Sequence, residues 1–294
     1  MAGAPASREI EPAGGLAVLL KAALPSIPLV NALPGVRKAS AKDFSGLAFS
    51  RPPVTVERAH VEAYAAVCGF PRKDTVPLPY PHLLAFGLQM AMMSDPAFPA
   101  PAIGTVHLEN SITSHRPIAI GETLAVSVGV GTPLAHPKGM VYEFRTEVRC
   151  DGEVVWTETS AYLRRGRGDG DASYGMVFPP AEPAGLTWQL PADLGRKYAA
   201  VSGDHNPIHL YPLTAKALGF PRQIAHGMWT KARCIAALEN RLPDAVRVDV
   251  AFKTPVSLPG AVAFGAGPVD RGIAFSLSNP RTGAPHVVGL STAL

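Results

Sequence analysis

The sequence predicts an α+β protein built from two tandem units, each a long helix wrapped by an antiparallel β-sheet. Three observations lead to this prediction: a segment that occurs twice, a long apolar helical pattern in each half, and runs of alternating hydrophobicity after each helix. The chain has 294 residues, which is enough for two such units, and 47% of them are hydrophobic against 17% charged. These proportions indicate a protein that forms an ordinary packed core.

The repeated segment is visible in the sequence itself. Residues 64–69 read YAAVCG and residues 198–203 read YAAVSG, at an offset of 134 positions (198 − 64 = 134). Two further pairs recur at similar offsets, namely Gly87 with Gly227 (227 − 87 = 140) and Pro117 with Pro255 (255 − 117 = 138). The apolar helical patterns of the two halves are predicted to open around Gly87 and around Gly227. A period of this length is too long for a solenoid repeat, so it indicates that a domain-sized unit has been duplicated.

Strands are expected where apolar and polar residues alternate between Gly, Pro or Asp residues. In the first half these segments are 54–56, 104–113, 122–130, 140–149 and 153–162. In the second half they are 186–190, 246–252, 262–266, 272–278 and 286–292. The apolar helices of the two halves need to be buried, and a sheet curling around each of them does so, with the two sheets continuous.

The chain is expected to divide where its composition changes. Residues 1–43 are predicted to form an N-terminal arm with a short amphipathic helix over 16–24, and residues 44–163 the first unit. Residues 164–185, rich in Gly, Asp and Pro, are predicted to be a linker to the second unit at 186–294.

Charge and cysteine usage argue against several classes of protein. The net charge is +4, but the only compact basic cluster lies at 164–167, so nucleic-acid binding is disfavoured. The three cysteines are far apart and form no CxxC pair, which indicates neither a disulfide framework nor a zinc site. No segment has the pattern of a signal peptide or a membrane span, so we expect a cytoplasmic protein.

A short helix and its end are predicted just before the segment that carries chemistry. Pro191 is expected to open a helix over 192–201, because proline is favoured in the first turn. Gly203 is suited to the left-handed conformation that ends such a helix.

The residues that follow predict a turn with two ionisable side chains. Asn206-Pro207 favours a tight turn, which would bring Asp204 and His209 together although five positions separate them. A carboxylate and an imidazole can handle a proton and hold a water molecule, at pKa values tunable toward neutrality. Further on, Gly227 is predicted to open the second apolar helix, and its backbone N–H could approach a substrate oxygen and stabilise the charge that develops on it.

These motifs resemble a known family. The run SGDHNPIH at 202–209, followed by GF at 219–220 and IAHGM at 224–228, is similar to the signature of MaoC-like hydratases, the (R)-specific enoyl-CoA hydratases or hydratase 2. The resemblance implies the hotdog fold, and the duplicated layout resembles the double-hotdog members of the family. It also implies that Asp204 and His209 form the catalytic dyad, that Asn206 supports the dyad by hydrogen bonding, and that the Gly227 N–H is the oxyanion donor.

The first unit departs from the pattern. In the repeat alignment Phe70 stands where Asp204 stands, and Phe86 where His226 stands. We therefore expect one active site per chain, with the first unit non-catalytic and able to leave room for an acyl tail.

The resulting hypothesis is reversible hydration of trans-2-enoyl thioesters to (R)-3-hydroxyacyl thioesters in fatty-acyl metabolism, carried on coenzyme A or an acyl carrier protein. Two alternatives stay open: a hotdog thioesterase, and a non-catalytic acyl-binding subunit. No metal or organic cofactor is implied, since His205, His209 and His226 lack the usual zinc spacing. The role of His226 stays open between ordering the turn and lining the site, and a homodimer is a further expectation.

Overall fold

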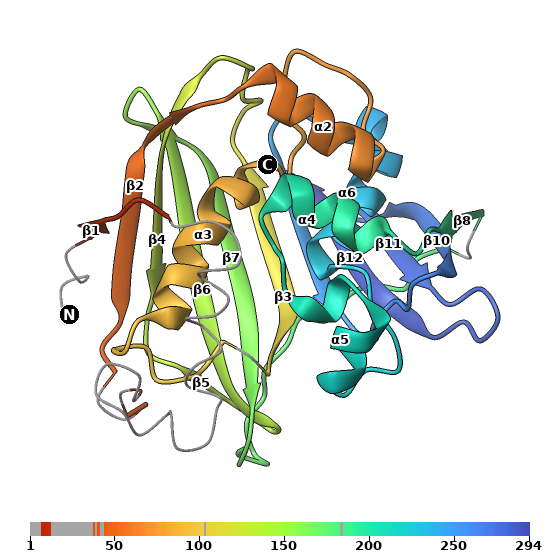
Figure 1. The fold of residues 1–294 in the computed structure, drawn as a ribbon. Helices are drawn as coiled ribbons and strands as arrows, with labels where there is room; N and C mark the ends of the chain where they lie inside the picture. Colours follow the sequence, from red (N-terminus) through yellow and green to blue (C-terminus); the bar gives the residue numbers. More distant parts are fainter. Residues whose placement is uncertain (1–6, 13–37, 39, 42–43, 103, 183–184) are drawn as a thin grey trace.

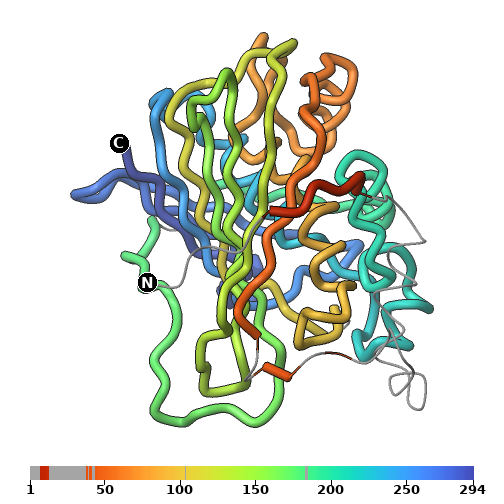
Figure 2. The backbone as a smooth tube through the Cα atoms, turned by 90° about the vertical axis from the view of Figure 1, so that its left-hand side faces the viewer, coloured from red at the N-terminus to blue at the C-terminus, as the bar shows by residue number. Residues whose placement is uncertain are grey.

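The computed structural model describes residues 7–12, 38, 40–41, 44–102, 104–182 and 185–294. A single twelve-stranded sheet carries two long helices, α3 (Pro81–Ser94) and α6 (Gly227–Leu238), on one face (Figures 1 and 2). Two shorter helices, α2 (Arg58–Cys68) and α4 (Leu194–Ser202), lie side by side (Figure 1). The buried apolar side chains of both halves form one main core.

The sheet runs continuously through both halves, as the sequence predicted. Its strand order is β1-β2-β4-β6-β7-β3-β9-β12-β11-β10-β8, with β5 paired to β6. The first-half strands are β1 (Arg8–Glu9), β2 (Leu47–Thr55), β3 (Thr105–Ser114), β4 (Thr123–Val130), β5 (Leu134–His136), β6 (Gly139–Cys150) and β7 (Glu153–Arg165). The second-half strands are β8 (Leu186–Leu190), β9 (Val246–Phe252), β10 (Gly260–Val269), β11 (Gly272–Ser278) and β12 (Pro285–Ala293). The two halves meet where β3 pairs antiparallel with β9.

The alternation of apolar and polar residues predicted the positions of the strands well, because one face of the sheet is buried under the helices. In β4 the residues Leu124, Val126 and Val128 are buried while their neighbours are more exposed. The observed β8, β9 and β11 coincide with the predicted segments. Strands β3 and β4 begin one residue later than predicted, and β6, β7, β10 and β12 extend further than predicted. The first strand was predicted much too short, because β2 spans Leu47–Thr55 rather than 54–56.

The start of the first long helix was predicted incorrectly. The helix does not open around Gly87 but begins at Pro81, after Tyr80, with proline in the first turn. Pro81 therefore stands where Gly227 stands at the start of α6, and Phe86 is not the counterpart of His226. Gly87 lies inside the helix, where a Cβ atom would come within 2.7 Å of the Pro12 side chain, so it permits close packing of the N-terminal segment.

The predicted helix over 192–201 is also displaced. Helix α4 begins at Leu194 instead, because Pro191 directly follows β8 and its carbonyl accepts a hydrogen bond from the Leu194 N–H. Gly203 ends the helix with φ of 75°, as expected for a glycine in the left-handed region.

The two halves differ most between their short and long helices. Both α2 and α4 end at a left-handed glycine, Gly69 and Gly203. In the first half, residues 69–80 then lead directly into α3. In the second half, the corresponding connection, residues 203–226, is twice as long. It contains the 3-10 helix η3 (Pro207–His209) and the helix α5 (Pro212–Ala217). The longer connection supplies the residues of the predicted site.

Phe70, which follows Gly69 where Asp204 follows Gly203, is a core residue. It is buried and stacks on Tyr64 with ring centroids 6.2 Å apart. We expect Phe70→Ala to lower the free energy of unfolding by about 3 kcal/mol, the cost of a large cavity in a core, and to leave turnover per folded molecule unchanged. Denaturant unfolding together with activity per folded protein checks this. A loss of turnover without a loss of stability would contradict it.

Two predictions concern segments at the edges of the described structure. The amphipathic helix over 16–24 lies outside the described residues, whereas β1 adds a short parallel edge strand to β2. The unit boundaries at 44, 164 and 186 stay predictions, although β7 runs to Arg165. None of the helices in the described part of the chain is long and apolar enough to cross a membrane.

Candidate active site

The turn after α4 is held by its own side chains. The Asp204 carboxylate accepts a hydrogen bond from the Asn206 N–H at 3.1 Å, and the Asn206 side-chain oxygen accepts one from the Ile208 N–H at 3.3 Å. The second bond caps η3, whose last residue is His209. Local hydrogen bonds of Asp and Asn thus fold the turn as the sequence predicted.

His209 is buried, and one of its two ring nitrogens is committed to the backbone. Its Nδ1 lies 2.8 Å from the Ile224 carbonyl oxygen. Because a carbonyl can only accept, Nδ1 carries the proton, and Nε2 of the neutral ring is a hydrogen-bond acceptor.

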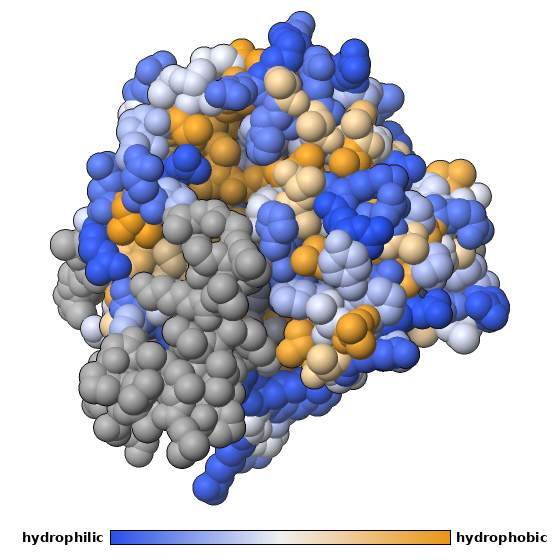
Figure 3. Space-filling view, in the orientation of Figure 1, coloured by the Kyte–Doolittle hydropathy of each residue, from blue (hydrophilic) through white to orange (hydrophobic). Residues whose placement is uncertain are grey.

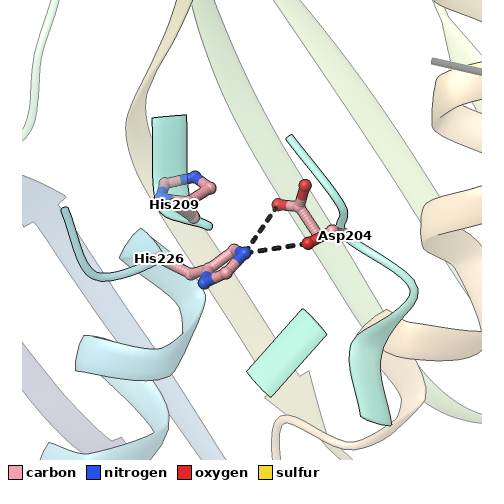
Figure 4. A group of neighbouring side chains, drawn as sticks. All are labelled: Asp204, His209 and His226. Atoms are coloured by element: carbon pink, nitrogen blue, oxygen red, sulfur yellow. Dashed lines mark hydrogen bonds and ion pairs between the residues drawn. The ribbon is translucent and has the colours of Figure 1, made fainter. Parts of the chain in front are cut away.

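His226 orders the turn and also lines the site. Its Nε2 donates a hydrogen bond of 2.9 Å to the Asp204 carbonyl oxygen and lies 3.8 Å from the Asp204 carboxylate (Figure 4). The ring stacks on that of His209, with centroids 3.7 Å apart. His226 therefore connects the turn to the start of α6 and also lines the cavity, so it has both of the roles between which the sequence left the choice open.

Gly227 is the first residue of α6. Its N–H is among the first four of the helix, which have no acceptor within the helix. An added Cβ atom would lie 3.3 Å from the Phe252 ring, so the position is already closely packed on that side. The helix start thus presents an N–H and the positive end of the helix dipole to the site.

Asp204, Asn206, His209 and Gly227 all line one cavity of about 360 Å³. The sequence-predicted site residues are therefore brought together, three from the turn and one from the helix start. The first half lines the same cavity through α3, β3 and β7, whose contributions include His82, Phe86, Met90, Met93, His107 and Tyr162. On the face shown in Figure 3, apolar side chains gather over α3, between β2 and α4. The cavity thus holds the polar residues of the turn and is also lined by the apolar side chains of Phe86, Met90 and Met93 on α3.

Burial and neighbouring charges set the ionisation of the site. Burial raises the pKa of Asp204, but His226, His209 and the Asn206 N–H outweigh it and leave the pKa below its ordinary value. Burial also lowers the pKa of His209, although Asp204 opposes this. Burial and His209 lower the pKa of His226 to about 3. At neutral pH the site therefore holds a carboxylate and two neutral imidazoles.

The same three side chains offer metal-ligating atoms within 4.8 Å of one another. However, Nδ1 of His209 and Nε2 of His226 both donate to backbone carbonyls. The nitrogen of His226 that faces Asp204 is Nε2, so a metal ion bound to that nitrogen would have to replace its hydrogen bond to the Asp204 carbonyl oxygen. The donor set therefore fits proton handling better than a metal centre.

Comparison with known proteins identifies the family. Residues 178–276 match the family described as MaoC like domain. The chain is 37% identical over 283 residues to 3-hydroxyacyl-thioester dehydratase X of Mycobacterium tuberculosis, an alignment that covers 93% of this chain and 96% of that protein. The chain belongs to the MaoC-like dehydratase family. Dehydratases are hydro-lyases, so the chain is an enzyme of that class.

Solved structures agree with the MaoC-like assignment. The crystal structure of HtdX from Mycobacterium tuberculosis superimposes with a TM-score of 0.75 at 35% identity, covering 84% of this chain and all of that one (100%). Rv0216 from the same organism, described as having a double hotdog fold, matches with a TM-score of 0.52 at 15% identity, covering 87% and 98% of the two chains. The predicted fold, two hotdog units in tandem, is thereby confirmed.

One group of polar residues facing the MaoC-like site was not found from the sequence. His82 of α3 lines the cavity and contacts Glu158 of β7. An isolated histidine in an apolar helix gives no signal of such a contact, and the two residues are 76 positions apart.

Proposed function

We propose that this enzyme adds water reversibly across the C2–C3 double bond of trans-2-enoyl thioesters, giving (R)-3-hydroxyacyl thioesters. The single observation that carries the proposal is that Asp204, His209 and Gly227, the first residue of α6, line the same cavity. The substrates proposed are thioesters of coenzyme A or of an acyl carrier protein. A homodimer stays a prediction for measurements in solution.

In the hydration direction, the Asp204–His209 pair accepts a proton from water as the water oxygen bonds to C3. The electron pair of the double bond moves toward the thioester carbonyl, whose oxygen gains negative charge. The Gly227 N–H, at the positive end of α6, stabilises that charge. The proton held by the pair then reaches C2, and the carbonyl re-forms. Dehydration follows the same steps in reverse.

Asn206 supports the pair in this scheme through its backbone as well as its side chain. Its N–H holds the Asp204 carboxylate, and its side chain caps the short helix that carries His209. The polar end of the cavity is thereby preorganised, which is what stabilisation of a transition state requires.

The assay follows crotonyl-CoA or a longer enoyl-CoA with two readouts. Hydration predicts loss of the enoyl thioester absorbance without free thiol, and chiral analysis of the product should give the (R) isomer. Release of free thiol would indicate a thioesterase instead. No change in either signal would indicate a non-catalytic acyl-binding protein, and both of these results would overturn the proposal.

The ionisation of the site predicts how activity depends on pH. His209 must be neutral to accept a proton, and its pKa lies below the ordinary 6.5 because it is buried. We therefore expect kcat/KM to stay constant as the pH falls from 8 through 6.5 and to decrease only at more acidic pH. A pH profile of the wild-type enzyme checks this, and a midpoint at or above 6.5 would contradict it.

A further inference from the structure

The cavity opens where the start of β3 meets the end of β9. Among the described residues that line the cavity, the ones exposed to solvent are Val106, Lys253, Thr254 and Pro255. Val106 belongs to the first turn of chain in β3, and the other three directly follow β9. The two segments are neighbours, because β3 pairs antiparallel with β9, with Glu109 opposite Ala251. We call these four exposed residues the rim, and the remaining lining residues lie deeper.

The rim is the place where the carrier of a thioester can pass. The cavity holds about 360 Å³, which is in the range of pockets for one small ligand. A carrier protein cannot enter such a space, so only its phosphopantetheine arm does. Coenzyme A presents its acyl group on the same arm. In both cases the arm runs from the thioester to a phosphate group, and it leaves the cavity across the rim.

Lys253 stands one residue away from the interior of the site. The ring of Phe252, the residue before it, lies 3.3 Å from the point where a Cβ atom on Gly227 would be. Neighbouring side chains of a strand point to opposite sides, so Phe252 is partly buried at the end of β9 while Lys253 is exposed. The Lys253 N–H donates a hydrogen bond of 2.8 Å to the His286 carbonyl oxygen of β12. The backbone that carries the lysine is therefore held in place close to Gly227.

The charge of Lys253 is not used within the described part of the chain. It is the single lysine or arginine among the described residues that line the cavity, and none of these residues forms an ion pair with its Nζ. Burial raises the pKa of Glu109, and the Met176 N–H and the Lys253 charge both oppose this rise. That carboxylate, however, already accepts the Met176 N–H at 2.6 Å. An ammonium group at the opening is suited to a phosphate, which lysine binds as a point charge.

We propose that Lys253 binds the phosphate group of the phosphopantetheine arm while the thioester lies beside Gly227. The ammonium group donates to the phosphate oxygens at the rim. The proton of the water still passes through Asp204 and His209, so Lys253 determines specificity for the carrier and takes no part in the proton transfer. The phosphate of the arm is common to acyl-CoA and to acyl carrier proteins, and it distinguishes both from thioesters without it. This inference rests on the proposed function.

The test uses two enoyl thioesters with the same acyl chain, one on pantetheine and one on 4′-phosphopantetheine, which differ in the phosphate alone. The readout is the ratio of their kcat/KM values, measured on one preparation so that the folded fraction cancels. The wild-type enzyme should prefer the phosphorylated thioester roughly three- to fivefold, as for one solvent-accessible ion pair. In Lys253→Gln we expect this preference to fall below about 1.5-fold.

Two further variants make the result specific to this charge. Lys253→Glu should reverse the preference, because a carboxylate at the rim repels the phosphate. Lys216→Gln is the matched control, since Lys216 of α5 is exposed but does not line the cavity, and it should keep the preference. A wild-type enzyme without the preference, a Lys253→Gln or Lys253→Glu variant that keeps it, or an equal loss in Lys216→Gln would overturn the role of Lys253.

The complete carriers show which group Lys253 contacts. Coenzyme A has a further phosphate on its ribose, which dephospho-coenzyme A lacks, and an acyl carrier protein has neither the ribose nor that phosphate. Lys253→Gln should lower kcat/KM by a similar factor for enoyl thioesters of all three, because they share the phosphate of the arm. A loss confined to coenzyme A would assign the lysine to the ribose phosphate, and a loss confined to the carrier protein would assign it to the protein surface. Either result would overturn the proposal.

The outcomes also separate this inference from the proposed function. A wild-type enzyme that hydrates none of these enoyl thioesters overturns both. A wild-type enzyme that hydrates them all, but at rates that do not depend on the phosphate, overturns only the role of Lys253.

Discussion

Replacing Asp204 with asparagine is expected to lower kcat by at least about 100-fold, the usual scale for loss of a general acid–base group. Asparagine is nearly the same size, and its side-chain oxygen can still accept the bond from the Asn206 N–H that holds the turn. It carries no negative charge and cannot take up the proton of the attacking water. The variant should therefore fold normally and fail in the chemical step.

Steady-state hydration of enoyl-CoA and a thermal unfolding curve measure the two parts of this prediction. Asp193→Asn is the matched control, because Asp193 lies just before α4 and pairs with Lys197 near the surface, away from the cavity. The control should retain full activity. An Asp204→Asn variant with more than about a tenth of wild-type kcat would remove Asp204 from the chemistry.

Replacing His209 with alanine is expected to cost at least about 100-fold in kcat as well. The change deletes the acceptor nitrogen that faces the cavity and also leaves the Ile224 carbonyl without its partner. Some loss of stability should accompany it, about 1 kcal/mol for one buried hydrogen bond. Activity per folded molecule, rather than total activity, is therefore the relevant measurement.

His205→Ala is the control for this variant. His205 belongs to the same turn, but its ring bonds to the Gly203 carbonyl and does not line the cavity. Its removal should leave kcat within about threefold of the wild type. If His205→Ala and His209→Ala reduced kcat equally, the turn as a whole would be required, with no particular imidazole in the chemistry.

The sequence predicted those parts of the fold that local patterns control. In β9 apolar and polar residues alternate from Val246 to Val250, and β11 is bounded by Gly272 and Ser278, so the predicted limits of both strands agreed with the structure. The predicted start of α3 disagreed with the structure. Gly87 had been matched to Gly227 by residue type, whereas the helix begins at Pro81. Gly87 lies where Pro12 packs closely against the helix, which leaves no room for a side chain. A comparison of residue types alone cannot show this contact.

The same distinction applies to the site. Asp204, Asn206 and His209 lie within one turn, whose folding depends on hydrogen bonds between near neighbours, so their proximity could be predicted. The bond between His226 and the Asp204 carbonyl crosses 22 positions, and that between His82 and Glu158 crosses 76. Such contacts depend on how the sheet brings distant strands and helices together, which no local pattern encodes.

The continuous pairing of β3 with β9 has a consequence for how this enzyme could diverge. In a symmetric dimer of identical subunits, every substitution appears twice, so a change that suits one copy is imposed on the other. Joining both copies in one polypeptide removes that constraint. One copy could shorten its loop to residues 69–80 and line the binding space, while the other kept residues 203–226 for chemistry. The covalent link thus allows the two copies to differ in sequence and to take different roles within one enzyme.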